Sequence, residues 1–468
     1  MTTKKYTEEI ARQWKETKKI GIIGLGDMGL LYAQKLSANG WQVVCCDRPE
    51  IFESVTVPKY HDKTKYSFKL VKDGHLLSRE CDYIIYSVEA ANLDKIVQVY
   101  GPSSKMGAIV GGQTSCKNGE IQAFEKYLPQ DVDIITVHSL HGPKVNTKGQ
   151  PLAIINHRVS KTLNSDFVDC VMDCFESKKV HLTAEEHDQI TADTQAVTHA
   201  AFLSMGRAWY KRQVYPWQST SNNGAKWSGG LENAKINISL RIYSNKWHVY
   251  AGLAITNPAA HKQILQYSQS ATEIFTLFME NKKEELTERL FKAKNFVFKK
   301  DVLNKQKVSL LLDDSMLQRF SLNDSRYIDD QHNVQERPSS VEQKIISNNH
   351  LSLLSIVDCW YQLGIIPYDH MICSTPLFRI FLGVSEYLFS NEKLLLQSIE
   401  AGCQNTEFRG DDLEFVIAAR NLSMMVSHGD FELYRKIFEE TQEFFKPMLP
   451  EATRIGNQMI KTILENTN

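Results

Sequence analysis

Short apolar runs alternate with helix-forming stretches between residues 19 and 183, and this pattern constrains the fold most strongly. The runs are rich in β-branched residues and lack the strict apolar–polar alternation of a half-exposed strand: KIGIIG, WQVVCCD, CDYIIYSV, GAIVGG, VDIITV, PLAIINH and KKVHLT. Such runs are typical of parallel strands covered by helices on both faces. The sequence therefore predicts a doubly wound α/β domain with a parallel sheet over residues 1–183.

The pattern becomes helical after Thr183. The segment TAEEHDQITADTQAVTHAAFLSMGRAWY opens with a capping box, Thr183 to Glu186, and continues with helical periodicity. Helical patterns then extend to the C-terminus, apart from a polar stretch near residues 301–348. We therefore expect an all-helical C-terminal region made of a helical domain over residues 184–300, a polar linker over 301–348 and a second helical domain over 349–468.

The helical region contains two similar segments, one starting at His199 and the other at His350. Aligned without a gap, they match Trp209 with Trp360, Tyr210 with Tyr361 and Pro216 with Pro367. Two later pairs are also similar: ISLRIYSNKWHVYAGL with PLFRIFLGVSEYLF, and KKEELTERLFKAKNF with GDDLEFVIAARNLSM. The second domain is therefore predicted to be a degenerate repeat of the first. The alternative is an ordinary helical extension with its own small core.

The composition is that of a globular protein with no charge-driven partner. The chain has 468 residues, 42% hydrophobic and 23% charged, with a formal net charge of −1. This balance argues against nucleic-acid or anionic-membrane binding, and the length favours two or three domains. The first twenty residues lack the apolar core of a signal peptide, and no run is long enough to span a membrane. We expect a soluble, cytoplasmic protein.

A glycine-rich turn follows the first apolar run. Gly24, Gly26 and Gly29 have G-x-G-x-x-G spacing, and they enclose Leu25, Asp27 and Met28. A strand precedes the turn and a helix follows it, so backbone N–H groups and the helix N-terminus can bind a pyrophosphate. This context predicts a Rossmann-like dinucleotide site.

Two residues after the second apolar run point to different cofactors. Asp47 stands where an acidic residue accepts the ribose hydroxyls of NAD, and Arg48 follows, where an arginine can bind the additional phosphate of NADP. The spacing alone leaves NAD and NADP equally open.

Three further motifs occur together: GGQTSCK, VHSLHGP and EEHDQITADTQAVTH. In order and spacing, the chain resembles the prephenate dehydrogenases, in the long fungal version of that family, over almost its whole length. The resemblance implies the oxidative decarboxylation of prephenate to 4-hydroxyphenylpyruvate in tyrosine biosynthesis, with NADP as the cofactor of the fungal enzymes. It also implies dimerisation through helical domains in bacterial relatives. Here the repeat would make the chain a monomer with an internal pseudo-dimer, and a homodimer is the alternative.

The chemistry of prephenate requires an acceptor for the proton of its C4 hydroxyl, and a neutral imidazole suits that role near neutral pH. His138, at the carboxyl end of a predicted strand, is the candidate base, and Ser115, expected to end the GGQTS strand, can hold the same hydroxyl. The alternative for His138 is a structural histidine bonded to loop backbone. His141 is expected to pack, and no metal is needed for hydride transfer.

The first long helix supplies candidate substrate ligands. At 3.6 residues per turn, Asp188, Gln195 and His199 are expected to share one face. His199 matches the substrate-contacting histidine of the family, and Gln195 is a second candidate. Arg241 is the candidate clamp for a substrate carboxylate, with Lys246 and His248 as competitors.

Other functions remain open from the sequence. The nearest is arogenate dehydrogenase, whose substrate carries an ammonium in place of the keto group. A β-hydroxyacid dehydrogenase or imine reductase would share the fold, but the H-x-x-x-G-P element would then be unexplained. A regulator that binds NADP without turnover is the alternative from another class, and its prediction is the loss of His138 or Ser115; both are present.

Overall fold

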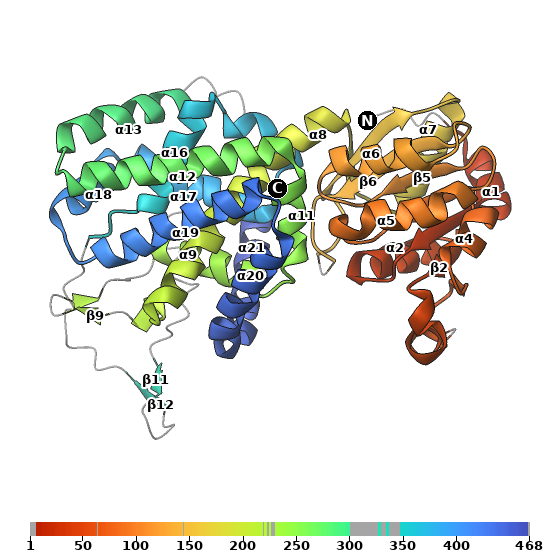
Figure 1. The fold of residues 1–468 in the computed structure, drawn as a ribbon, viewed down its shortest axis with the longest axis horizontal. Helices are drawn as coiled ribbons and strands as arrows, with labels where there is room; N and C mark the ends of the chain where they lie inside the picture. The colour runs from red at the N-terminus through yellow and green to blue at the C-terminus, as the bar shows by residue number, and fades with distance from the viewer. Residues whose placement is uncertain are drawn as a thin grey trace. The chain divides into compact units, whose positions relative to one another are not determined.

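The chain forms two compact units, Met1–Thr191 and Ala192–Asn468 (Figure 1). The computed structural model describes residues 6–62, 64–143, 145–218, 220–221, 224–225, 230–299, 326–328, 334–336 and 347–466. Most of the predicted linker, 301–348, lies outside the described residues. The Rossmann-like sheet and the helical region that follows it are both confirmed.

The first unit is built around an eight-stranded sheet of order β3-β2-β1-β4-β5-β6-β7-β8. The strands are β1 Lys19–Ile23, β2 Gln42–Cys46, β3 Lys69–Leu70, β4 Tyr83–Tyr86, β5 Ile109–Gly112, β6 Asp133–Ser139, β7 Pro151–Arg158 and β8 Lys178–His181. Only the short β3 was not expected. Consecutive residues of β4 enter two different cores: Ile85 packs in one with Ile20 and Val137, and Ile84 packs in the other with Val110. Burial on both faces explains why the runs do not alternate.

The prediction of a wholly parallel sheet was wrong for the last two strands. β7 runs antiparallel to β6, whereas β8 is parallel to β7. The segment between β6 and β7 contains no helix among its described residues, and an antiparallel neighbour needs no crossover helix. A buried apolar run reads the same in either direction, so its direction was not encoded in the pattern.

Helices cover the sheet of the first unit. They are α1 Glu8–Thr17, α2 Asp27–Ala38, α3 Val57–Tyr60, α4 Gly74–Glu80, α5 Ala90–Tyr100, α6 Lys117–Tyr127, α7 Thr162–Met172 and α8 Ala184–Thr191. Trp14 of α1 and Phe167 of α7 pack edge to face, with ring centroids 5.4 Å apart. The capping box predicted at Thr183 and Glu186 is present, because each side chain bonds the backbone N–H of the other residue.

The second unit is helical around one shared core. Its helices are α9 Val197–Arg212, α10 Leu231–Tyr243, α11 His248–Thr256, α12 Pro258–Met279, α13 Lys283–Val297, α16 Leu351–Leu363, α17 Pro376–Ser390, α18 Glu392–Gln404, α19 Arg409–Ser427, α20 Phe431–Phe445 and α21 Leu449–Asn466. A single cluster of buried side chains extends from Ala192 to Ile460. In the described part of the chain, no helix is both long and apolar enough to cross a membrane.

The two repeats predicted from the sequence begin in the same way. α9 ends at Gln213 and α16 at Gly364, and both residues adopt the left-handed conformation, with φ of 53° and 70°. The Gln213 N–H donates to the carbonyl of Tyr210 at 3.0 Å, and the Gly364 N–H donates to that of Tyr361 at 3.1 Å. The 3₁₀ helices η6 Pro216–Gln218 and η7 Pro367–Cys373 follow. The aligned residues therefore share one helix-ending geometry.

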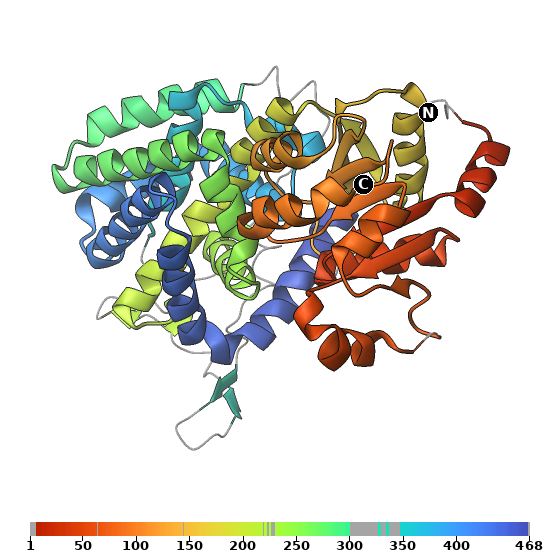
Figure 2. The same ribbon diagram turned by 45° about the vertical axis from the view of Figure 1, so that its right-hand side comes forward.

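Helix packing extends this correspondence and corrects one part of it. α9 packs against α19, and α16 packs against α12; α12 and α19 also pack on each other (Figures 1 and 2). This exchange makes α12 the counterpart of α19. The sequence match of residues 282–296 with 410–424 instead pairs α13 with α19, so it is displaced by one helix. Amphipathic helices share a period, which explains the displacement.

Candidate functional site

The glycine turn has the geometry of a dinucleotide site. β1 ends at Ile23, Gly24 has φ +100°, and α2 begins after its N-cap, Gly26. A Cβ on Gly24 would overlap the carbonyl oxygen of Ser87, and a Cβ on Gly29 would overlap that of Gly24. A Cβ on Gly26 would meet no described protein atom within 4 Å. The turn is therefore closed toward the protein and open at the helix N-terminus, which fits a bound pyrophosphate.

Asp47 and Arg48 lie just beyond the carboxyl end of β2. The Asp47 carboxylate accepts the backbone N–H of Arg48 at 2.8 Å, so one of its oxygens is used by the loop itself. The Arg48 side chain is exposed, and no partner for its guanidinium occurs among the described residues. This arrangement leaves a positive charge beside the position of the ribose and suits a cofactor with a phosphate there.

A buried ion pair supports the turn between β5 and α6. The Lys117 ammonium, fully buried, donates to Glu120 at 2.8 Å, to Thr136 at 3.0 Å and to the carbonyl of Val137 at 2.9 Å. The other Glu120 oxygen accepts the N–H and the hydroxyl of Thr114. Val137 precedes the candidate base, so Lys117 fixes the end of β6 as well as the turn that carries Ser115.

Asp188 joins the start of α6 to a histidine that the sequence reading did not select. Its carboxylate accepts the backbone N–H groups of Lys117 and Asn118, each at 2.7 Å. The same carboxylate lies 2.8 Å from Nδ1 of His187. Carboxylates are favoured at a helix N-terminus, where N–H groups lack helical partners. Asp188 is thereby held in one orientation and can fix the proton of His187.

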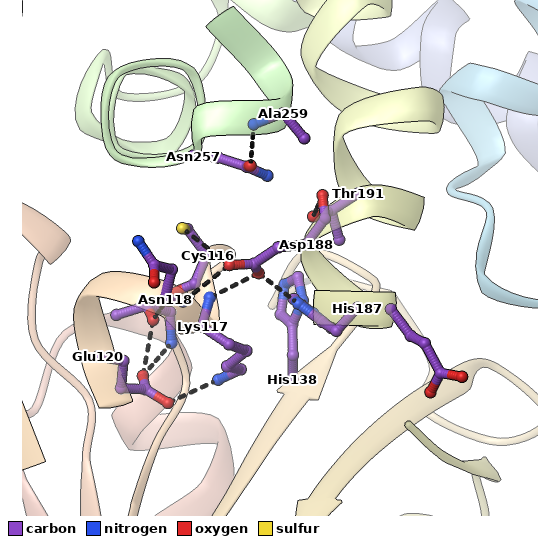
Figure 3. Close-up of polar contacts among 12 residues, drawn as sticks. Cys116, Lys117, Asn118, Glu120, His138, His187, Asp188, Thr191, Asn257 and Ala259 are labelled. Atoms are coloured by element: carbon purple, nitrogen blue, oxygen red, sulfur yellow. Dashed lines mark hydrogen bonds and ion pairs between the residues drawn. The ribbon is translucent and has the colours of Figure 1, made fainter. Parts of the chain in front are cut away.

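His138 and His187 are directly hydrogen bonded. Nδ1 of His138 lies 2.8 Å from Nε2 of His187, and both rings are buried (Figure 3). Asp188 accepts a proton from Nδ1 of His187, so Nε2 of that ring accepts from Nδ1 of His138. A neutral imidazole carries one proton, which leaves Nε2 of His138 with a lone pair. The chain Asp188–His187–His138 thus selects the tautomer in which His138 can accept a proton.

The electrostatics keep both histidines neutral. Burial lowers the pKa of His138 well below its ordinary value, and the nearby His187 and Lys117 lower it further. Burial also lowers the pKa of His187, although Asp188 opposes this shift. Burial disfavours the ionised form of Asp188, but His187 and the N–H groups of Lys117 and Asn118 outweigh it, so its pKa lies below the usual range. The result is a neutral base supported by an ionised carboxylate.

The dinucleotide turn and the candidate base lie at the same edge of the sheet. Gly24 follows β1 and His138 is the last residue but one of β6, and both strands end at the edge where α/β folds bind their ligands. The Tyr32 hydroxyl of α2 bonds that of Ser139 at 2.7 Å. The helix that follows the glycine turn is thereby tied to the strand that carries His138.

Two predictions near His138 need adjustment. Ser115 does not end a strand, because β5 stops at Gly112 and Ser115 lies in the turn before α6. His141 packs beyond β6 with its Nδ1 bonded to the carbonyl of Gly142 at 3.0 Å. His187 and Lys117 were missed, although the H-D pair and the lysine of Q-x-S-x-K were both visible in the sequence.

In the second unit, Gln195 and His199 present unpaired polar atoms. Among the described residues, Nε2 of Gln195 and Nδ1 of His199 are buried without a hydrogen-bond partner. Burial lowers the pKa of His199 to about 3, so this ring is also neutral. A π-helical turn, Ala192–Ala196, separates α8 from α9. Its wider turn invalidates the regular 3.6-residue spacing by which Asp188 was placed on the same face as Gln195 and His199.

His199 and Arg241 both approach Tyr250. The His199 and Tyr250 rings pack edge to face with centroids 4.7 Å apart. Burial raises the pKa of Tyr250, and the charge of Arg241 partly offsets that rise. The Arg241 guanidinium also donates to Asn457 of α21. We call His199, Tyr250 and Arg241 the Tyr250 cluster; it unites two of the residues selected from the sequence.

A dinucleotide turn, a neutral buried histidine at the same sheet edge and a helical second unit define a two-domain NAD(P)-dependent dehydrogenase. Family models agree with this class. The NAD binding domain of 6-phosphogluconate dehydrogenase matches residues 19–126. A model of the 6-phosphogluconate dehydrogenase C-terminal domain matches residues 196–465, more than half of the chain.

Full-length relatives identify the family. The chain is 62% identical to the prephenate dehydrogenase [NADP(+)] of Saccharomyces cerevisiae over 99% of this chain and 97% of that protein. It is 51% identical to a probable prephenate dehydrogenase [NADP(+)] of Schizosaccharomyces pombe, over 97% of this chain and 99% of that one. A probable arogenate/prephenate dehydrogenase of Methanocaldococcus jannaschii is 23% identical over 54% of this chain and 56% of its own length. The chain belongs to the NADP-dependent prephenate dehydrogenase family.

Proposed function

We infer that this chain oxidatively decarboxylates prephenate to 4-hydroxyphenylpyruvate with NADP, in tyrosine biosynthesis. The observation that carries this inference is the full-length identity to two NADP-dependent prephenate dehydrogenases. A neutral, oriented histidine at the sheet edge that holds the glycine turn supports it. The expectation of an NADP-dependent enzyme from the sequence is confirmed.

The reaction needs a hydride acceptor and a proton acceptor. Bound NADP would supply the first, at the turn formed by Gly24, Gly26 and Gly29. Prephenate bears a hydroxyl on C4 of its ring, and loss of hydride from C4 is eased when the hydroxyl loses its proton to form a carbonyl. Loss of carbon dioxide then makes the ring aromatic. The protein must therefore hold the hydroxyl against a base.

We assign the proton transfer to His138. Its Nε2 has the free lone pair, because Nδ1 donates to His187 and Asp188 fixes the His187 tautomer. The positive charge that His138 gains is stabilised through His187 by the Asp188 carboxylate, as in other carboxylate-oriented imidazoles. Ser115 is proposed to bond the same hydroxyl. Its hydroxyl has no partner among the described residues of the first unit.

We assign substrate binding to the second unit. Prephenate carries two carboxylates, and a guanidinium can bind one of them through two parallel hydrogen bonds. Arg241 is the proposed clamp, with Lys246 and His248 as competitors. Gln195 and His199 carry the unpaired buried atoms expected of groups that await a polar ligand. These assignments rest on the resemblance and on that lack of partners.

The second helical repeat is proposed to replace a partner subunit, so that the chain works as a monomer. α16 and α19 cover α12 and α9, and the two halves share one core. His370 of the second repeat binds Asp193 of the first at 2.9 Å, two residues before Gln195. The second repeat therefore supports the segment that carries the proposed substrate ligands. Arg379, aligned with Arg241, donates to Ser374 at 3.0 Å and has a structural role.

One experiment separates the candidate reactions. The absorbance of reduced cofactor is followed with prephenate or arogenate as substrate, each with NADP or NAD. Prephenate with NADP is expected to give the highest kcat/KM. Preference for arogenate would identify an arogenate dehydrogenase instead. Saturable NADP binding without turnover of either substrate would favour the regulator that binds NADP and catalyses nothing.

A further inference from the structure

The helical unit contains a cavity that the proposed reaction does not use. Its volume is about 150 Å³, and it lies between α9, α10, α19 and α20. Buried side chains form its floor and walls: Leu203, Ser204, Tyr243, Ala418, Leu422, Met425, Tyr434 and Phe438. Lys211, Ile417 and Asn421 form an exposed rim. A cavity of this volume can hold one benzene-sized ring.

Ser204 supplies an unused hydrogen-bonding group to this cavity. It is 2% exposed, and its hydroxyl has no partner among the described residues. Most serine and threonine hydroxyls in these helices donate to the carbonyl four residues earlier, as Thr198 does to Thr194 and Thr441 to Ile437, at 2.7 and 2.9 Å. A buried polar group without a partner is costly, which suits a position that a ligand completes.

The matching region of the second repeat is satisfied internally. The alignment of His199 with His350 places Ser204 on Ser355 and Arg207 on Asp358. The Ser355 hydroxyl donates to the carbonyl of Leu351 at 2.6 Å. Asp358 accepts two hydrogen bonds from Arg289, each at 2.7 Å. The unsatisfied hydroxyl is thus a property of the first repeat and not of the helix pair as such.

Charges of both signs surround the cavity. Ser204, Arg207 and Lys211 lie on one face of α9, and the last is about 10 Å along the helix axis from the first, at 1.5 Å per residue. The Arg207 guanidinium is already bound to Glu440 and Thr441 through Nη1. Lys211 on α9 and Glu414 on α19 are the remaining charged lining residues. A ligand with a carboxylate for Lys211 and an ammonium for Glu414 matches this pair.

We propose that this cavity binds an aromatic α-amino acid at a site separate from the Tyr250 cluster. The ring occupies the apolar hollow, a ring hydroxyl bonds Ser204, and the zwitterionic end lies between Lys211 and Glu414. Phe438 lines the cavity and also stacks on Tyr250, with ring centroids 6.0 Å apart. An occupant therefore touches a wall of the Tyr250 cluster. The proposal does not depend on the reaction assigned to the chain.

Calorimetric titration of the full-length protein tests the proposal with three probes. L-tyrosine has both charges, tyramine lacks the carboxylate, and 3-(4-hydroxyphenyl)propionate lacks the ammonium. We expect L-tyrosine to bind at one site per chain and each analogue to bind about tenfold or more weakly, as for the loss of one charged hydrogen bond. No measurable binding of L-tyrosine, or equal binding of all three probes, would overturn the proposal.

Matched variants locate the site. Ser204→Leu fills the hollow and should abolish L-tyrosine binding, whereas His199→Asn, in the Tyr250 cluster, should leave it unchanged. Glu414→Gln, at the rim, should weaken L-tyrosine and tyramine about tenfold and leave 3-(4-hydroxyphenyl)propionate unchanged. If Ser204→Leu fails to fold, the selective effect of Glu414→Gln decides. Binding that survives Ser204→Leu and Glu414→Gln but is lost in His199→Asn places the ligand at the Tyr250 cluster and overturns the proposal.

Discussion

Nδ1 of His138 lies 2.8 Å from Nε2 of His187. Two neutral imidazoles in contact can share only one proton between the facing nitrogens, so a third group must decide which ring donates. Asp188 decides, because it accepts from Nδ1 of His187 at 2.8 Å while its position is fixed by two N–H groups of α6. The free lone pair of His138 is therefore set by a carboxylate that does not touch it.

His138→Asn should remove the base and preserve the shape of the site. We expect turnover to fall by roughly 10² to 10⁴, the usual contribution of a general base. NADP affinity, measured by titration without substrate, should change little, because His138 lies outside the glycine turn. A variant with near-normal turnover would return His138 to the role of a structural histidine bonded within the protein.

The pH profile should reflect the lowered pKa of His138. The neutral ring is the active form, so kcat/KM rises with pH through this pKa and is lost as the ring becomes protonated. Burial and the nearby His187, Lys117 and His141 all lower that pKa. The acid limb of kcat/KM should therefore lie below the ordinary histidine pKa of about 6.5. An acid limb above this value would contradict the assignment of His138 as a buried neutral base.

Asp188→Asn should invert the tautomers. An amide can donate to Nδ1 of His187, which moves the proton of that ring to Nε2 and forces Nδ1 of His138 to accept. The lone pair needed for catalysis is then lost. By analogy with the same change in a serine protease triad, turnover should fall by about 10⁴. Asp169→Asn is the matched control, since Asp169 pairs with Lys179 and His181 elsewhere in the unit; an equal loss in the control would refute the tautomer argument.

The sequence was sufficient for the parts of the site that depend on local spacing. The glycines of the turn and the histidine near the end of β6 were identified because each has a signature within one strand and the residues that follow it. His187 was missed because its partner, His138, is distant in sequence and only the fold brings them together. The direction of β7 and the π turn Ala192–Ala196 also escaped prediction. Neither a buried apolar run nor helical periodicity encodes such features.

Arg48→Ala tests the choice of cofactor. The side chain is exposed beyond β2, and a hydrogen bond to a charged group is worth about 1.5 to 3 kcal/mol. NADP binding should weaken by that amount, and NAD binding should remain nearly unchanged, because NAD lacks the additional phosphate. Both affinities are measured by fluorescence titration of the same preparation. Equal losses for the two cofactors would mean that Arg48 stacks on the adenine or supports the loop.

The shared core of the helical unit yields the last prediction. Phe202 of the first repeat packs against Phe381 of the second, with ring centroids 4.8 Å apart, and Trp209 packs against Phe445 at 6.3 Å. Neither repeat can therefore bury its apolar face alone. The full chain should bind one NADP per chain and remain monomeric in sedimentation experiments. A chain that ends near residue 345 should expose α9 and α12 and form aggregates or dimers. A truncated protein that stays monomeric, soluble and fully active would show that the second repeat is an ordinary extension and not an internal partner.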